Sequence, residues 1–124
     1  MDVLILESDE QEAERITAIV SRLGHGAYPA CSEAEARRLL ADQAFDLVFW
    51  DLEFDPDLGL PLIEQWKRLN SSWLLAAFIA NNTREKEAVA RVQGVLRFLH
   101  KPALEKDLCQ ILAFAESRTG RAAG

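Results

Sequence analysis

The stretch Phe45-Asp46-Leu47-Val48-Phe49-Trp50-Asp51 ends an apolar run abruptly at a carboxylate, and it decides the fold. Its apolar residues do not alternate with polar ones, which is typical of a strand covered on both faces in a parallel sheet. Ligands of open α/β sheets bind at the carboxyl ends of the strands. Asp51 is therefore a candidate cation ligand or phosphoryl acceptor, although an aspartate here can also simply end a strand and cap a turn.

The segments on both sides of this strand alternate between strand and helix patterns. Further strands are predicted at residues 3–6, 27–30, 73–80 and 95–99, and a helical pattern follows each of the five strands. Right-handed crossovers then give a parallel sheet with helices on both faces. The sequence predicts one α/β domain over residues 1–117, and residues 118–124 are interpreted as a tail or the start of a linker.

Capping patterns predict where several helices begin. Ser32 with Glu35 forms a capping-box pattern, and Ser8 with Gln11 predicts a helix that begins at Asp9. Asn82 predicts a helix from Thr83, with its apolar side facing inward at Ala88, Val89 and Val92. The last helix is expected to pack through Leu104, Leu108, Ile111, Leu112 and Ala115.

Composition excludes several classes of function. The chain has 124 residues, 49% of them hydrophobic, and a net charge of −6 with scattered basic residues, so this segment is not expected to bind nucleic acid. No apolar run reaches the roughly 20 residues of a membrane span, and the acidic start enters a strand directly, without a signal peptide. Cys31 and Cys109 lack metal-ligand spacing, which favours free thiols in the cytoplasm.

The chain resembles the receiver domains of two-component response regulators over roughly residues 2–117. Three anchors carry the resemblance: Glu7-Ser8-Asp9-Glu10 after the first strand, Asp51 with Gly59 eight residues later, and Phe98-Leu99-His100-Lys101-Pro102. The resemblance implies a flavodoxin-like (βα)5 three-layer sandwich with strand order 2-1-3-4-5. It also implies phosphoryl transfer from a histidine kinase or phosphotransfer protein to Asp51, with Lys101 as charge partner, and a cis peptide between Lys101 and Pro102.

Two positions depart from the family pattern where its chemistry lies. Receivers usually carry two adjacent acids after the first strand, but here Ser8 follows Glu7. The resemblance implies Mg²⁺ held by Glu7, Asp51 and the backbone carbonyl of Glu53. Because Ser8 removes a charge and Glu7 is longer than aspartate, we expect this binding to be weak. The Glu53 side chain could compensate for the missing charge or repel a phosphoryl group.

The second departure is Ala80, which stands where the family has the Thr or Ser of its switch. That hydroxyl bonds the phosphoryl oxygen, a contact of about 1.5–3 kcal/mol. Inverting a 1:99 equilibrium takes about 5.5 kcal/mol, so we expect the switch, including the aromatic Phe98, to respond weakly. The resemblance also implies homodimer or effector contacts through the face formed by the helix from 83, the strand over 95–99 and the last helix.

Three functions remain open at this point. The first is a phosphorylatable receiver with weakened metal and switch chemistry, and the alternative is a pseudo-receiver interaction module that signals without phosphate. The third, an aspartyl-phosphate enzyme, is disfavoured because Asp51-Leu52-Glu53 follows the third strand, whereas haloacid-dehalogenase-type phosphatases want Asp-x-Asp after the first. We expect a phosphoryl acceptor rather than an enzyme, and the sequence names neither its kinase nor its output.

Overall fold

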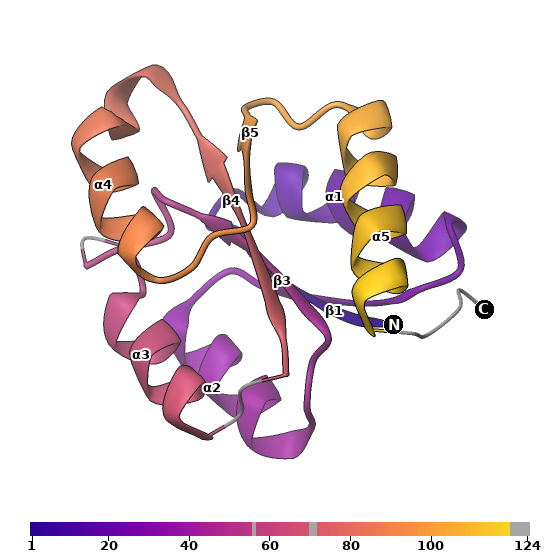
Figure 1. Cartoon of the computed structure of the whole chain (residues 1–124), viewed down its shortest axis with the longest axis horizontal. Coiled ribbons are helices and arrows are strands. Elements are labelled where there is room, and N and C mark those ends of the chain that lie inside the picture. Colours follow the sequence, from indigo (N-terminus) through magenta and orange to yellow (C-terminus); the bar gives the residue numbers. More distant parts are fainter. Residues whose placement is uncertain (56, 70–71, 120–124) are drawn as a thin grey trace.

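The computed structural model describes residues 1–55, 57–69 and 72–119 (Figure 1). The described residues form five strands and five α-helices in alternation. The strands are β1 (Asp2–Leu6), β2 (Gly26–Ala30), β3 (Leu47–Asp51), β4 (Leu74–Ile79) and β5 (Arg97–His100). The helices are α1 (Glu10–Arg22), α2 (Glu33–Asp42), α3 (Leu60–Leu69), α4 (Arg84–Val92) and α5 (Glu105–Thr119), with a short 3-10 helix η1 (Asn81–Thr83) before α4.

The strands form one parallel sheet in the order β2-β1-β3-β4-β5. This confirms the predicted fold class and strand order. β3 lies at the centre, and all of its residues are buried, as its unbroken apolar sequence predicted. The peptide between Lys101 and Pro102 is cis, as the resemblance implied.

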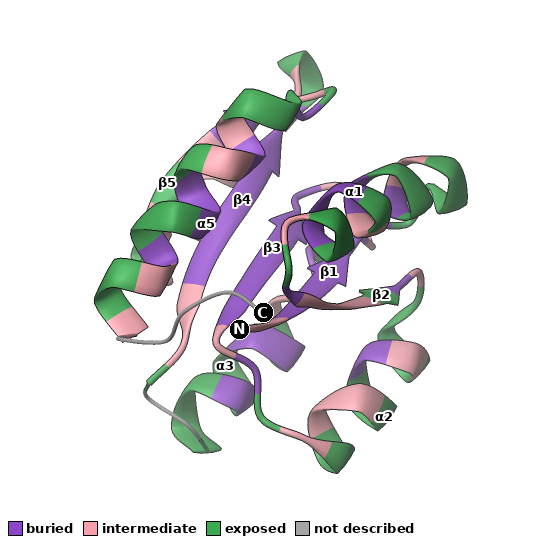
Figure 2. Cartoon of the chain, turned by 90° about the vertical axis from the view of Figure 1, so that its right-hand side faces the viewer, coloured by how far each residue is buried: buried purple, intermediate pink, exposed green. Residues whose placement is uncertain are grey.

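The sheet is the middle of three layers. Helices α1 and α5 cover one face, and α2, α3 and α4 cover the other (Figure 1). Because successive side chains of a strand point to opposite faces, Val48 and Trp50 of β3 enter the core beneath α2, α3 and α4, whereas Leu47 and Phe49 enter the core beneath α1 and α5. Figure 2 shows β1, β3 and β4 almost wholly buried, so the strands that lead to Glu7 and Asp51 lie inside the core.

The caps of α1 and α2 test two sequence predictions. Ser32 caps α2 as predicted, accepting the backbone N–H of Glu35 at 3.2 Å. The predicted cap of α1 at Ser8 is wrong by one residue, because the side chain of Asp9 accepts two backbone N–H groups of the first turn instead. A carboxylate next to a helix N-terminus is favoured over a neutral hydroxyl by the helix dipole.

The predicted packing of α4 is wrong. The turn Asn81–Thr83 is a separate 3-10 helix, so α4 begins at Arg84 and its inward face is displaced. The residues expected to face inward are exposed, Val92 at 78% of its surface, and Ala90 is the buried one. Because a 3-10 turn is wound more tightly than an α-helix, it changes the direction in which the later side chains of the helix point.

The last helix extends further than predicted. Leu104 lies before α5 and is 52% exposed, so its predicted packing is wrong, whereas Leu108, Ile111, Leu112 and Ala115 are buried as expected. α5 continues to Thr119, so residues 118 and 119 of the predicted tail are helical. Residues 120–124 of that tail lie outside the described residues. Among the described helices, none has the length and apolar character to span a bilayer.

Candidate functional site

The sheet brings the predicted acids and lysine together at one edge. Glu7 directly follows β1, Asp51 is the last residue of β3, and Lys101 directly follows β5. Backbone hydrogen bonds fix these strand ends, since Glu7 N–H donates to the Ala30 carbonyl at 3.2 Å and Lys101 N–H donates to the Ile79 carbonyl at 2.8 Å. The parallel topology therefore accounts for the convergence that the sequence predicted.

Lys101 lies among three carboxylates. Its Nζ is 2.8 Å from Asp51 Oδ1, 3.0 Å from Glu53 Oε2 and 3.8 Å from Glu7 Oε1. Burial lowers the pKa of Lys101, but its hydrogen bonds to Asp51 and Glu53 outweigh burial and leave the pKa above its ordinary value. We call Glu7, Asp51, Glu53 and Lys101 the acid cluster. Its lysine is a firmly protonated cation.

Glu7 and Asp51 are the deeply buried members of the acid cluster. Their exposed fractions are 1% and 0%, and Glu7 Oε2 and Asp51 Oδ2 accept no hydrogen bond from a described donor. Burial, followed by a hydrogen bond to Asp51 and repulsion by its charge, raises the pKa of Glu7 from 4.5 to about 9. The fold therefore favours the protonated form of Glu7.

Glu53 contributes to the acid cluster in two ways. Its backbone N–H donates to Asp51 Oδ1 at 3.1 Å, which fixes the orientation of that carboxylate. Its side chain binds Lys101 and the Asn82 side chain, and these hydrogen bonds hold the pKa of Glu53 below its ordinary value. The side chain of Glu53 therefore bonds a lysine, and the sequence did not predict this ion pair.

The acid cluster offers hard oxygen ligands of the kind Mg²⁺ prefers. Two buried carboxylate oxygens without a hydrogen-bond partner, on Glu7 and Asp51, fit an ion that accepts one or two carboxylates and several waters. Among the described residues there is no group of three or more His, Cys, Asp or Glu side chains arranged to hold a metal. Ser8 is exposed and neutral, so the third acid that would complete such a group is missing.

The switch region is Ala80, Thr83 and Phe98, beside the acid cluster. Ala80 follows β4, and its methyl side chain has no hydrogen-bond donor. The fully buried hydroxyl of Thr83 accepts the Ala80 N–H at 2.8 Å and donates to the Ala80 carbonyl at 2.7 Å. Sequence reasoning missed Thr83, although a threonine three residues after a strand end is a recognisable capping pattern.

Phe98 lies half-buried on β5, on the side of the sheet that α4 covers. The guanidinium of Arg91 lies 4.7 Å from the centre of its ring. A groove of about 490 Å³ runs between α4 and β5, and its lining includes Ala80, Phe98 and Arg91. The predicted switch residues therefore share one groove beside the acid cluster.

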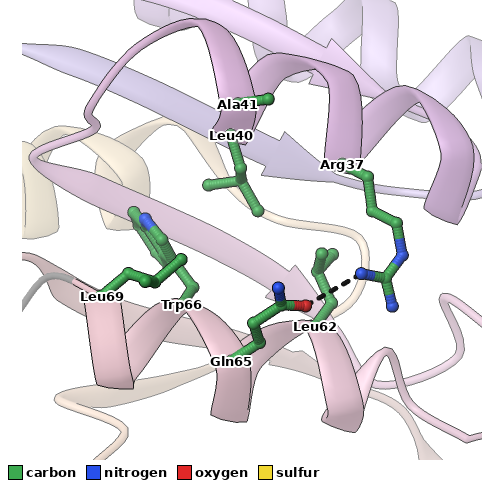
Figure 3. A pocket seen from close by; sticks show the side chains of 7 residues that line it. All are labelled: Arg37, Leu40, Ala41, Leu62, Gln65, Trp66 and Leu69. Atoms are coloured by element: carbon green, nitrogen blue, oxygen red, sulfur yellow. Dashed lines mark hydrogen bonds between the residues drawn. The ribbon is translucent and has the colours of Figure 1, made fainter.

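Another hollow, of about 210 Å³, lies between α2 and α3 (Figure 3). Leu40, Leu62, Trp66 and Leu69 make its lining mostly apolar, and an Arg37 to Gln65 hydrogen bond of 2.9 Å crosses it. None of the seven lining residues belongs to the acid cluster or to the switch region. The candidate chemistry therefore lies at the carboxyl edge of the sheet.

Comparisons with known proteins add a family to this geometry. The chain is 30% identical over 110 residues to the DNA-binding transcriptional regulator NtrC of Azospirillum brasilense, covering 87% of this chain and 23% of that protein. It is 34% identical over 80 residues to the alginate biosynthesis regulator AlgB of Pseudomonas putida, covering 64% of this chain and 18% of that protein. The chain thus spans less than a quarter of the length of these curated relatives.

Solved structures support the fold. The receiver domain of NtrX from Brucella abortus superimposes with a TM-score of 0.82 at 23% identity, covering 94% of this chain and 98% of that one. A signal receiver domain from Pseudomonas fluorescens Pf-5 gives a TM-score of 0.85 at 22% identity, with 96% of each chain covered. No family model matches the sequence. On its sequence similarity to NtrC and AlgB and on this fold, the chain belongs to the receiver domains of two-component response regulators.

Proposed function

We propose that Asp51 accepts a phosphoryl group from a histidine kinase or phosphotransfer protein, with weakened metal and switch chemistry. The observation that carries the proposal is the environment of the Asp51 carboxylate. Oδ1 is held by Lys101 and by the backbone N–H of Glu53, while Oδ2 accepts no described donor. A carboxylate oriented through one oxygen and unoccupied at the other has the geometry of a nucleophile.

Transfer from a phosphohistidine forms one bond to phosphorus and breaks another. An oxygen of Asp51 bonds to phosphorus while the bond from phosphorus to the imidazole nitrogen breaks, and the electron pair of that bond stays on the nitrogen. Lys101, already protonated, stabilises the charge on the phosphoryl oxygens without giving up its proton. The chain is then the acceptor in this transfer rather than an enzyme with a substrate of its own.

The metal part of the proposal is weak binding of Mg²⁺ by Glu7, Asp51 and the Glu53 backbone carbonyl. When bound, the ion neutralises charge on the phosphoryl oxygens. Two features of the acid cluster oppose it. Lys101 is already paired with the Asp51 carboxylate. Glu7, whose pKa is raised, must lose its proton before it can bind the ion.

Partners are proposed at the face of α4, β5 and α5, either a second copy of this chain or an effector domain. Val89, Val92 and Phe114 are exposed apolar residues on α4 and α5. The curated relatives are several times longer than this chain, which supports an output beyond the receiver. Because the Azospirillum relative is a DNA-binding transcriptional regulator, we propose a cytoplasmic location, with no contact to DNA through this acidic segment.

A second candidate function is an interaction module that works without phosphate. Its support is the switch region, where Ala80 offers no hydroxyl and the Thr83 hydroxyl is already bonded to both the N–H and the carbonyl of Ala80. The Ala80 side chain then cannot distinguish a phosphorylated from an unphosphorylated Asp51, and a ligand shifts an equilibrium only by its differential interaction.

Intact-mass spectrometry of the protein after treatment with phosphoramidate and Mg²⁺ tests the proposal. Wild type should gain the mass of one phosphoryl group, and Asp51→Asn should gain none because it lacks the nucleophile. Asp57→Asn is the matched control, since Asp57 is an exposed acid in the loop after β3. An unchanged wild-type mass would favour the phosphate-independent module, and equal labelling of Asp51→Asn would place the acceptor elsewhere.

A further inference from the structure

The side chain of Glu53 forms an ion pair with the Lys101 ammonium group, which phosphoryl transfer needs. Glu53 Oε2 is 3.0 Å from Lys101 Nζ, nearly as close as Asp51 Oδ1 at 2.8 Å. Its carboxylate also bonds Asn82, in the turn after β4. One side chain therefore links the loop after β3 to the turn after β4 and to the residue after β5.

An incoming phosphoryl group meets this ion pair first. The Glu53 side chain is 32% exposed, whereas the side chains of Glu7 and Asp51 are only 1% exposed, so Glu53 is the acid at the solvent side of the cluster. A phosphoryl oxygen must replace Glu53 on Lys101, and the negative charge of Glu53 repels an anion that approaches Asp51. Ala80 offers no side-chain donor to take the place of the lysine.

We infer that Glu53 is a specificity-determining residue. By pairing with Lys101, it slows phosphoryl transfer from donors in proportion to their negative charge. The inference rests on the proposed acceptance of a phosphoryl group at Asp51. It assigns Glu53 a role through its side-chain charge, separate from the metal ligand expected of its backbone carbonyl. A phosphorylated partner protein reaches Asp51 only if its own surface displaces or neutralises Glu53.

The test compares two small donors that differ in charge. Acetyl phosphate is a dianion near pH 7, and its transfer breaks the bond from phosphorus to the acyl oxygen and releases acetate. Phosphoramidate reacts as a monoanion that carries its proton on nitrogen, and its transfer breaks the phosphorus–nitrogen bond and releases ammonia. In both cases the new bond joins phosphorus to an Asp51 oxygen, so the donors differ in charge but not in product.

Glu53→Gln keeps the size and hydrogen-bonding capacity of the side chain and removes its charge. We expect the rate of labelling by acetyl phosphate to rise about tenfold and the rate with phosphoramidate to rise about threefold, because repulsion scales with the charge of the donor. Glu64→Gln is the matched control, since it removes an exposed acid on α3 and should leave both rates unchanged. Equal acceleration of both donors, or none, would overturn the inference even though wild type is labelled at Asp51.

A second measurement does not depend on transfer. Inorganic phosphate, titrated into ¹⁵N-lysine-labelled protein, should shift the Lys101 resonance in Glu53→Gln at about tenfold lower concentration than in wild type. Equal midpoints in the two proteins would overturn the inference. If neither protein is ever labelled but the midpoints differ as expected, the guarding role of Glu53 holds and the proposed phosphoryl acceptance is the part that fails.

Discussion

The acid cluster and the switch region are adjacent at the same edge of the sheet, and they differ in what they retain. In the acid cluster, Lys101 contacts Asp51 and Glu53 within 3.0 Å, and every charged group expected from the receiver resemblance except the acid at Ser8 is present. In the switch region, a methyl group replaces the expected hydroxyl at Ala80, and Thr83 bonds the loop to itself. Accepting a phosphoryl group and responding to it depend on different residues, so one can persist while the other weakens.

Among the substitutions compared at neutral pH, the largest expected loss of stability comes from removing the cation of the acid cluster. Lys101→Met leaves the buried Asp51 carboxylate without the cation that pairs with it, and we expect the free energy of unfolding at neutral pH to fall by about 3 kcal/mol. Urea denaturation measures it. Lys106→Met on α5, an exposed lysine, should change stability by less than about 0.5 kcal/mol. A Lys101 variant as stable as this control would mean that the ion pairs do not compensate the buried acids.

The switch region should respond to the loss of one buried hydroxyl. Thr83→Val leaves the Ala80 N–H without a partner and leaves the Ala80 carbonyl only the backbone N–H of Thr83, so we expect a loss of about 1–2 kcal/mol and faster hydrogen exchange at the start of α4. Thr17→Val is the matched control, because the buried Thr17 hydroxyl has no hydrogen-bond partner among the described residues and its removal should cost almost nothing. Similar losses in both variants would show that Thr83 is not a special restraint.

Glu7 should make the stability of the domain depend on pH. Its pKa is raised from 4.5 in the unfolded chain to about 9 in the fold, so the folded state holds the proton more tightly. The resulting stability is fully present below pH 4.5 and is lost as pH rises toward 9, with a slope of up to about 1.4 kcal/mol per pH unit. Glu7→Gln should remove this dependence, and Glu14→Gln on the exposed side of α1 should not. An unchanged pH profile in Glu7→Gln would mean that Glu7 is ionised in the fold.

The smallest expected effect concerns the metal. Ser8→Asp restores a charge beside Glu7, and we expect Mg²⁺ to bind about tenfold more tightly, which is about 1.4 kcal/mol. Isothermal titration calorimetry measures the change. Ser32→Asp adds a charge at the cap of α2 and should leave the affinity unaltered. Equal affinities in wild type and Ser8→Asp would show that charge at this position does not limit metal binding.

The fold and most of the acid cluster could be predicted from the sequence because their signals are periodic. The unbroken apolar run of β3 predicted that the strand is buried. The alternation of strands and helices predicted that Glu7, Asp51 and Lys101 lie at one edge of the sheet. Side-chain partners could not be predicted in the same way. Whether Glu53 turns to Lys101 or to a metal depends on tertiary distances of a few ångströms, which spacing along the chain does not encode.

The errors at α4 have a local cause. Val89 and Val92 fit a helical stripe, but the 3-10 turn Asn81–Thr83 shifts the phase of the helix, and Ala90 is buried instead. Helix periodicity alone does not reveal where a helix begins to within one residue, and one residue rotates the face by about 100°.

The central claim is that Asp51 accepts a phosphoryl group while the switch region responds weakly. NMR of wild type and Ala80→Thr, each with and without the phosphoryl mimic beryllofluoride and Mg²⁺, tests it most directly. We predict that the resonances around Asp51 and Lys101 shift in both proteins, and that those of Phe98 and α4 shift fully only in Ala80→Thr, which restores the missing hydroxyl. A full, saturating shift of Phe98 and α4 in wild type, with nothing added by Ala80→Thr, would contradict the claim.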